Sequence, residues 1–146
     1  MSEIHELTAT DAASRLVTGE LSSESYIAAL LERIAATEPG ILAWAHLDPA
    51  AALAQARALD VAMAQGHPPG PLHGVPVGLK DIIDTADMPT ANGSAIFAGR
   101  MPAADATATK LLREAGAVIM GKTVTTEFAL SGARQTRNPH DPTRTP

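Results

Sequence analysis

The feature that most constrains the fold of this chain is a change of character between residues 66 and 80. The stretch GHPPGPLHGVPVG is dense in Gly and Pro, so it cannot form a long helix. A short strand through about Val75–Leu79 is expected to follow it. Helical patterns dominate before this break, and helix and strand alternate after it. The break therefore marks where the sheet becomes the main organising element.

Helices are expected before the break wherever apolar residues recur at helical spacing between good cap residues. They cover approximately residues 8–19, 22–38 and 49–66, and the pair Pro39-Gly40 is expected to stop the second. A short strand around Trp44 separates the second helix from the third. Caps fix these ends because they satisfy backbone groups that a helix leaves unpaired.

After the break, the sequence predicts a helix that begins near Asp105 and a strand in AVIMGKT. TTEFALSG is expected to form one or two helical turns, and the tail ARQTRNPHDPTRTP a loop. Alternation of helix and strand with Gly at the joins predicts an α/β fold with a mostly parallel sheet. Gly74 and Gly78 have no side chains, so another backbone is expected to approach closely there.

Composition excludes several classes of function. The net charge is -5 without a basic cluster, which argues against direct binding of nucleic acid. The apolar runs are too short for a membrane span, the N-terminus lacks a signal-peptide pattern, and cysteine is absent. The histidines are scattered without metal-ligand spacing, so no metal or cofactor is expected. The simplest interpretation is a cytoplasmic protein; its oligomeric state is not predicted.

Lys80 and Asp81 stand in the middle of the apolar segment GPLHGVPVGLKDIIDT. Lys80 would lie at the carboxyl end of the predicted strand, which is where α/β sheets usually bind ligands. The apolar neighbours predict that Lys80 is mostly buried, which disfavours its ammonium form and would suit a general base. The alternative is a solvated lysine that simply ends a strand. For Asp81, hydrogen bonding to nearby backbone is the preferred interpretation.

The segment GPLHGVPVGLKDIIDTADMPTANGS resembles the lysine block of the amidase signature family. The resemblance continues through DATATKLLREAGAVIMGKTVTTEFA to NPHDPTRTP, and the N-terminal helices also fit. It implies an α/β fold with helices around a mixed central sheet. It also implies hydrolysis or transfer of small-molecule amides by a Ser–cis-Ser–Lys triad, without cofactor or metal. In the family's G-[VI]-P-x-x-x-K-D block the catalytic lysine corresponds to Lys80.

In the family, both serines lie in a Gly/Ser-rich signature that follows a segment like NPHDPTRTP, and this sequence stops at Pro146. The resemblance therefore implies the N-terminal part of a single amidase domain. Residues 1–66 would be mainly helical, and residues 67–146 would be an α/β segment with the lysine block. This chain alone is expected to be inactive. It is also expected to expose an apolar patch.

The resemblance further implies that Ala129, Leu130 and Ser131 contact the acyl part of the substrate. A plain helix end at Gly132 is the alternative.

Three other polar residues receive structural interpretations. Ser94 is the best local serine, but a turn or cap residue is the stronger interpretation. Glu127 is expected to anchor its loop by hydrogen bonds, and Lys122 is interpreted as a strand-end residue without chemistry.

Three functions remain open at this point. The preferred one is an amide hydrolase of which only the lysine of the triad is present. The second is the A subunit of a glutamyl-tRNA(Gln) amidotransferase, which frees ammonia from glutamine for a partner. The third is a shortened, non-catalytic module.

Overall fold

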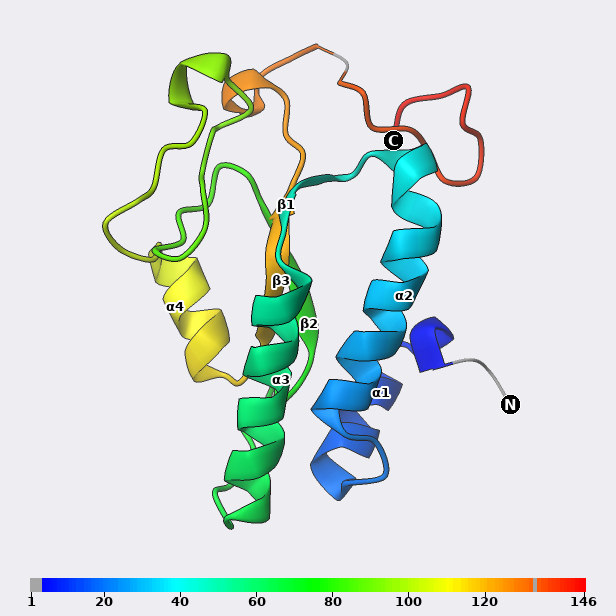
Figure 1. The fold of residues 1–146 in the computed structure, drawn as a ribbon, viewed down its shortest axis with the longest axis vertical. Helices are drawn as coiled ribbons and strands as arrows, with labels where there is room; N and C mark the ends of the chain where they lie inside the picture. Colours follow the sequence, from blue (N-terminus) through cyan, green and yellow to red (C-terminus); the bar gives the residue numbers. More distant parts are fainter. Residues whose placement is uncertain (1–3, 133) are drawn as a thin grey trace. The chain divides into compact units, whose positions relative to one another are not determined.

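The computed structural model describes residues 4–132 and 134–146 (Figure 1). The predicted helices and strands form, with shifts at some ends, and the short 3-10 helices η1 and η2 were not predicted. The elements are η1 (Ile4–Glu6), α1 (Ala9–Thr18), α2 (Ser23–Ile41), β1 (Trp44–Leu47), α3 (Pro49–Ala64), β2 (Pro76–Lys80), η2 (Ala95–Phe97), α4 (Thr107–Glu114), β3 (Val118–Thr123) and η3 (Glu127–Ala129). None of the helices within the described ranges is long and apolar enough to cross a membrane.

The ends of the first and third helices follow from local chemistry. The Thr8 hydroxyl accepts a hydrogen bond from the Asp11 N–H at 3.1 Å, which caps α1. Gly19 ends this helix in the left-handed conformation, with φ of 76°. The Asp48 carboxylate caps α3 in the same way through the Ala51 N–H at 3.0 Å, and Pro49 occupies the first helical position.

Two predicted helix ends are wrong. Helix α2 passes through Pro39 and ends at Ile41, because a proline in the last turn removes one hydrogen bond where the helix is ending anyway. Helix α4 starts at Thr107 and not near Asp105. The Asp105 carboxylate accepts a hydrogen bond from the Ala86 N–H at 2.8 Å. A distant loop therefore uses a side chain that the sequence pattern assigns to the helix start.

The strands form a three-stranded sheet in the order β1-β3-β2, so β3 is central. Strand β1 runs antiparallel to β3, with His46 opposite Lys122. Between β2 and β3, the Val118 N–H donates to the Val75 carbonyl and the Asp81 N–H to the Thr123 carbonyl, each at 2.9 Å. Partners that advance together along both strands indicate parallel pairing. The sheet is therefore mixed, as the resemblance implied, and the expectation of a mostly parallel sheet from the alternation of helix and strand is wrong.

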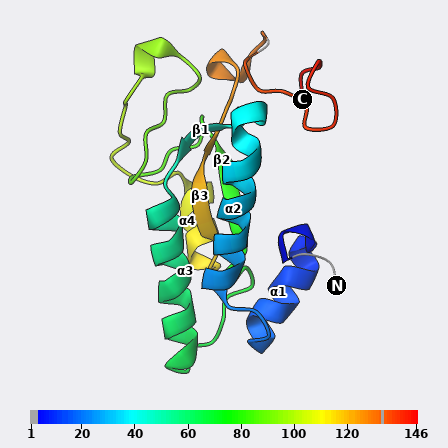
Figure 2. The same ribbon diagram turned by 45° about the vertical axis from the view of Figure 1, so that its right-hand side comes forward.

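The chain divides into two compact units. The first comprises Met1–Ile34, Asp48–Val77 and Leu111–Met120. Its core joins α1, α2 and the residue just before β2, because Ala12, Leu16, Tyr26 and Val75 are buried together. Helix α3 runs beside the start of β3 (Figure 2). There the Gln55 side-chain amide donates a hydrogen bond to the Ile119 carbonyl and accepts one from the Ile119 N–H, both at 3.2 Å.

The second unit comprises Ala35–Leu47, Gly78–Lys110 and Gly121–Pro146, and it contains Lys80. Several of its large apolar side chains are exposed: Ile82, Ile96, Met101, Phe128 and Leu130. Exposed apolar surface was expected for this chain, but whether these side chains act as one patch stays a prediction. Binding of a hydrophobic dye would test it.

Candidate active site

Lys80 is the last residue of β2, and its side chain is exposed. The prediction that it is mostly buried is therefore wrong. Two features of the fold explain this. Strand β2 lies at an edge of the sheet, and successive side chains of a strand point to opposite faces. Leu79 is only 3% exposed, so the next side chain faces away from the core.

Although exposed, Lys80 lines a cavity of about 570 Å³ in the second unit. Two cationic side chains, several threonines and the C-terminal residues surround it. The lining residues are Ala43, Lys80, Thr123, Val124, Thr125, Thr126, Gly132, Arg134, Thr136, Thr145 and Pro146. The Lys80 amine therefore lies in a concave site large enough for a small molecule. It does not project from a flat surface.

The two neighbouring strands place alternate residues on opposite faces. Lys80 and Thr123 line the cavity, whereas the residues next to them, Asp81 and Lys122, are buried. The Lys122 amine lies 3.8 Å from the Asp81 carboxylate. This alternation explains how one apolar segment accommodates two adjacent charges: one faces a cavity, and the other is paired inside.

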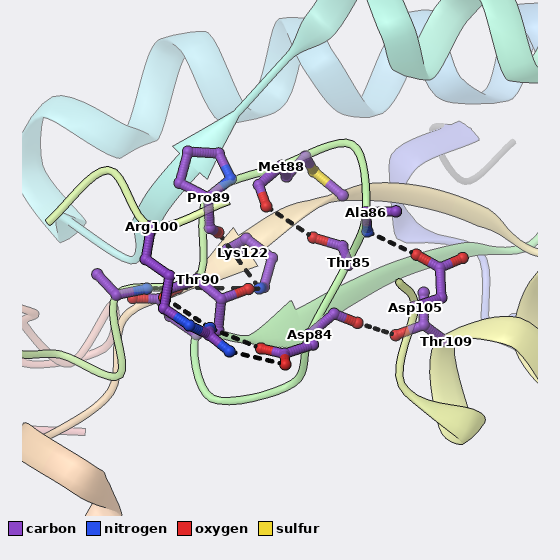
Figure 3. Close-up of polar contacts among 12 residues, drawn as sticks. Asp84, Thr85, Ala86, Met88, Pro89, Thr90, Arg100, Asp105, Thr109 and Lys122 are labelled. Atoms are coloured by element: carbon purple, nitrogen blue, oxygen red, sulfur yellow. Dashed lines mark hydrogen bonds and ion pairs between the residues drawn. The ribbon is translucent and has the colours of Figure 1, made fainter. Parts of the chain in front are cut away.

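Lys122 is the main residue that the sequence reasoning missed. Its side chain is completely buried, and its amine donates to the Thr90 hydroxyl at 2.6 Å and to the Pro89 carbonyl at 3.4 Å (Figure 3). Burial lowers the pKa of Lys122, while the nearby Asp81 acts in the opposite direction. The apolar run AVIMG before it was the only sequence signal of this burial.

A second set of contacts holds the loop that follows Lys80 (Figure 3). The Arg100 guanidinium donates to both carboxylate oxygens of Asp84 at 2.9 Å. These hydrogen bonds hold the pKa of Asp84 below its ordinary value. The Thr109 hydroxyl, on α4, donates to the Asp84 carbonyl at 2.9 Å. Arg100 and Thr109 therefore both anchor the loop at Asp84.

The Asp81 carboxylate accepts a hydrogen bond from the Ala91 N–H at 3.1 Å, which confirms its predicted bonding to backbone. The prediction for Gly78 is wrong in detail. A side chain there would meet the Thr123 methyl group at 3.0 Å and the Trp44 ring at 3.1 Å, so side chains and not a backbone approach it. At Gly74 the neighbours are likewise side chains, those of Ser23 and Leu16.

The residues expected to contact the substrate lie on the η3 turn and just after it. Leu130 is 79% exposed, and Ala129 adopts a left-handed conformation with φ of 57°. Ser131 lines a smaller hollow of about 200 Å³ together with Glu127, Gly132 and Arg134. Gly132 and Arg134 also line the Lys80 cavity. Ser131 therefore shares lining residues with the Lys80 cavity without being part of its lining.

Glu127 anchors the η3 turn, as predicted. The Ser94 hydroxyl donates to its carboxylate at 2.6 Å, and the Phe128 N–H donates to the Asn92 carbonyl at 2.9 Å. The rings of Phe97 and Phe128 meet edge to face, with centroids 5.9 Å apart. Ser94 is buried and held in this contact, which agrees with a structural role and not with that of a nucleophile. Over the described parts of the chain, no group of acidic, His or Cys side chains could hold a metal ion.

Comparison with known proteins agrees with this geometry. The family model described as Amidase matches residues 25–146. The A subunit of the glutamyl-tRNA(Gln) amidotransferase of Chloroflexus aurantiacus is 45% identical over 152 residues, which cover 100% of this chain and 31% of that protein. The corresponding protein of Streptomyces coelicolor is 43% identical, with the same coverage of 100% and 31%. The chain thus spans less than a third of these relatives.

Solved structures show the same relationship. The peptide amidase of Stenotrophomonas maltophilia superposes with a TM-score of 0.85 at 38% identity, over 94% of this chain and 31% of that one. A fatty acid amide hydrolase superposes with a TM-score of 0.80 at 26% identity, over 93% of this chain and 25% of that one. The expected α/β class is confirmed by these neighbours. The chain therefore belongs to the amidase family, whose members carry the amidase signature.

Proposed function

We propose that Lys80 is the general base of an amide hydrolase with a Ser–cis-Ser–Lys triad. This chain would be the N-terminal part of its single amidase domain. The observation that carries the proposal is the position of Lys80, at the end of β2 and in the lining of the 570 Å³ cavity. The amidase family match over residues 25–146 supports the same chemistry. We place the enzyme in the cytoplasm.

The proposed reaction begins with a neutral Lys80 amine. It takes a proton from the middle serine, which takes one from the nucleophilic serine as that oxygen attacks the amide carbonyl. Backbone N–H groups stabilise the oxyanion, and the C–N bond breaks as the leaving amine takes back, through the middle serine, the proton held by Lys80. Water then hydrolyses the acyl-enzyme. In this proposal both serines would lie outside this chain, and Ala129, Leu130 and Ser131 would contact the acyl part of the substrate.

A second candidate has its own support. The curated relatives at 45% and 43% identity are the A subunits of glutamyl-tRNA(Gln) amidotransferases. In that case the same triad would release ammonia from glutamine, and a partner protein would receive it. The peptide amidase, at 38% identity, favours the free hydrolase. Glutamine and a simple aryl amide, offered to the same enzyme, would separate the two candidates.

The test uses the protein made from the complete reading frame. Lys80→Ala should lower turnover by orders of magnitude with little loss of substrate binding, because the amine acts in proton transfer. Lys110→Ala is the matched control, since Lys110 is also an exposed lysine of the second unit. Undiminished turnover in Lys80→Ala would reject the base. A reading frame that stops after Pro146 would favour the non-catalytic module.

The 146-residue chain alone should not hydrolyse amides. It offers a base without a plausible nucleophile, and a base alone cannot form an acyl-enzyme. Hydrolysis of an aryl amide by the purified chain, lost in Lys80→Ala, would contradict this.

A further inference from the structure

We propose that Lys122 is a positioning residue whose buried amine joins β3 to the loop of residues 81–92 and thereby fixes the backbone that presents Lys80 to its cavity. The inference rests on the role of Lys80 proposed above. It adds a residue that the sequence pattern left without a function.

Lys122 reaches both ends of the loop from one position on the central strand. Its amine donates to the Thr90 hydroxyl at 2.6 Å and to the Pro89 carbonyl at 3.4 Å, near the end of the loop. The Asp81 carboxylate, at the start of the loop, lies 3.8 Å away. The Lys122 side chain has no exposed surface, so water cannot take over these contacts if the amine is removed.

Asp81 carries this constraint to Lys80, its neighbour in the chain. The Asp81 N–H donates to the Thr123 carbonyl, and its own carbonyl accepts from the Asn92 N–H, both at 2.9 Å. Its carboxylate accepts from the Ala91 N–H at 3.1 Å. The Asp81 residue is therefore held through its backbone and its side chain together. Lys80 cannot turn away from the cavity unless these bonds break.

The hydrogen bonds between Arg100 and the loop do not involve the Lys122 amine, although Lys122 also attracts Asp84 electrostatically. Arg100 holds Asp84 through two bonds of 2.9 Å, and the Thr90 N–H donates to the Arg100 carbonyl at 2.9 Å. Loss of the amine should therefore loosen the contacts at Thr90, Pro89 and Asp81 while the hydrogen bonds made by Arg100 remain. This predicts a local change near Lys80 and not a loss of the whole loop.

The chemistry of the side chain supports a positioning role. A methionine would fill a similar volume without the cost of burying an amine, and burial is the first cause of the lowered pKa of Lys122. Only the hydrogen bonds and the ion pair of the amine can offset the free-energy cost of burying it. Those bonds end on Thr90, Pro89 and Asp81, and all three residues belong to the loop beside Lys80.

The test follows the Lys80 amine directly. The lysines of the chain are Lys80, Lys110 and Lys122, and the first two are exposed. Reductive methylation of the 146-residue chain with ¹³C-formaldehyde should label these two amines and the N-terminal α-amine, and Lys80→Arg and Lys110→Arg assign the two lysine signals in the NMR spectrum. In Lys122→Met, the Lys80 signal should shift or broaden while the Lys110 signal stays in place. Lys110→Met is the control and should leave the Lys80 signal unchanged.

A second variant guards against misfolding. Lys122→Met leaves the Asp81 carboxylate buried without its cation, so the double variant Lys122→Met with Asp81→Asn removes this unpaired charge. Circular dichroism confirms which variants fold. A folded variant lacking the Lys122 amine whose Lys80 signal keeps its wild-type position would overturn the inference. The signal reports placement whether or not Lys80 is catalytic, so failure of the proposed function would appear separately, as undiminished turnover in Lys80→Ala.

Discussion

The ends of β2 and β3 each carry a lysine within an apolar sequence, and their surroundings are opposite. Lys80 is exposed and lines a cavity, whereas Lys122 is completely buried and makes its contacts with a single loop. The difference follows from the sheet order β1-β3-β2, in which Lys122 lies on the central strand and Lys80 on an edge strand. The apolar neighbours of a lysine therefore do not decide its burial. The position of its strand in the sheet and the face to which its side chain points decide it together.

The largest expected effect of this difference is on stability. Lys122→Ala should lower the free energy of unfolding by about 3–5 kcal/mol, because it leaves a buried carboxylate unpaired and opens a cavity. Lys80→Ala should change it by about 0.5 kcal/mol or less, as is usual for exposed side chains. Urea unfolding of the 146-residue chain measures both. Equal losses in the two variants would show that the two lysines do not differ as described.

The helices were predictable because their signals are local. Thr8, Gly19 and Asp48 cap helices within a few residues of their own positions, and Pro49 sets the start of α3. The strands were also recognised, since each is a short apolar run between turn residues. What the sequence could not supply was the strand order, because pairing joins segments far apart in the chain. The mixed sheet and the exposure of Lys80 both depend on that order.

The candidate site was only partly predictable, because some of its contacts also join segments far apart in the chain. The lysine block identified Lys80 by resemblance, whereas the only local sign that Lys122 is buried was the apolar run AVIMG before it. Its burial depends on Thr90, which lies 32 residues away in the chain. Asp105 shows the same limit. Its carboxylate accepts a hydrogen bond from the Ala86 N–H, 19 residues away in the chain, and α4 does not start at Asp105 as its sequence pattern suggested. Contacts of this range are decided by the tertiary fold.

A second prediction concerns the close pairing of β1 with the central strand β3 at Gly121, next to Lys122. A side chain added at Gly121 would overlap the His46 carbonyl oxygen of β1. Gly121→Ala should therefore lower the free energy of unfolding by about 1–3 kcal/mol, the usual cost of overpacking. Gly40→Ala is the matched control, because nothing lies near that position in α2, and it should stabilise by about 0.5–1 kcal/mol. Thermal or urea unfolding distinguishes them, and a neutral Gly121→Ala would mean that β1 does not press on β3.

The smallest expected effect is a pH dependence that Lys122 alone should produce. Burial lowers the pKa of Lys122 from its ordinary value of 10.5. Between the lowered pKa and 10.5, the unfolded chain binds more protons than the folded one, so stability should rise with pH through this range. Burial raises the pKa of Tyr26 above its ordinary value of 10.0, which should lower stability at pH above 10.0. The Lys122 effect is therefore best measured below that point.

The measurement is urea unfolding of the wild type and of Lys122→Met between neutral pH and about pH 9.5, below the ordinary range of tyrosine. The wild type should gain stability relative to the variant as pH rises, because the variant has no amine to deprotonate. The rise should persist in Lys80→Met, in which Lys122 is intact. Parallel curves for the wild type and Lys122→Met would mean that the buried amine keeps its ordinary pKa, compensated by Asp81. Lys122 would then be a cation paired with Asp81, and its burial would cost little free energy. The two lysines would then differ in their contacts and not in the stability that they contribute with pH.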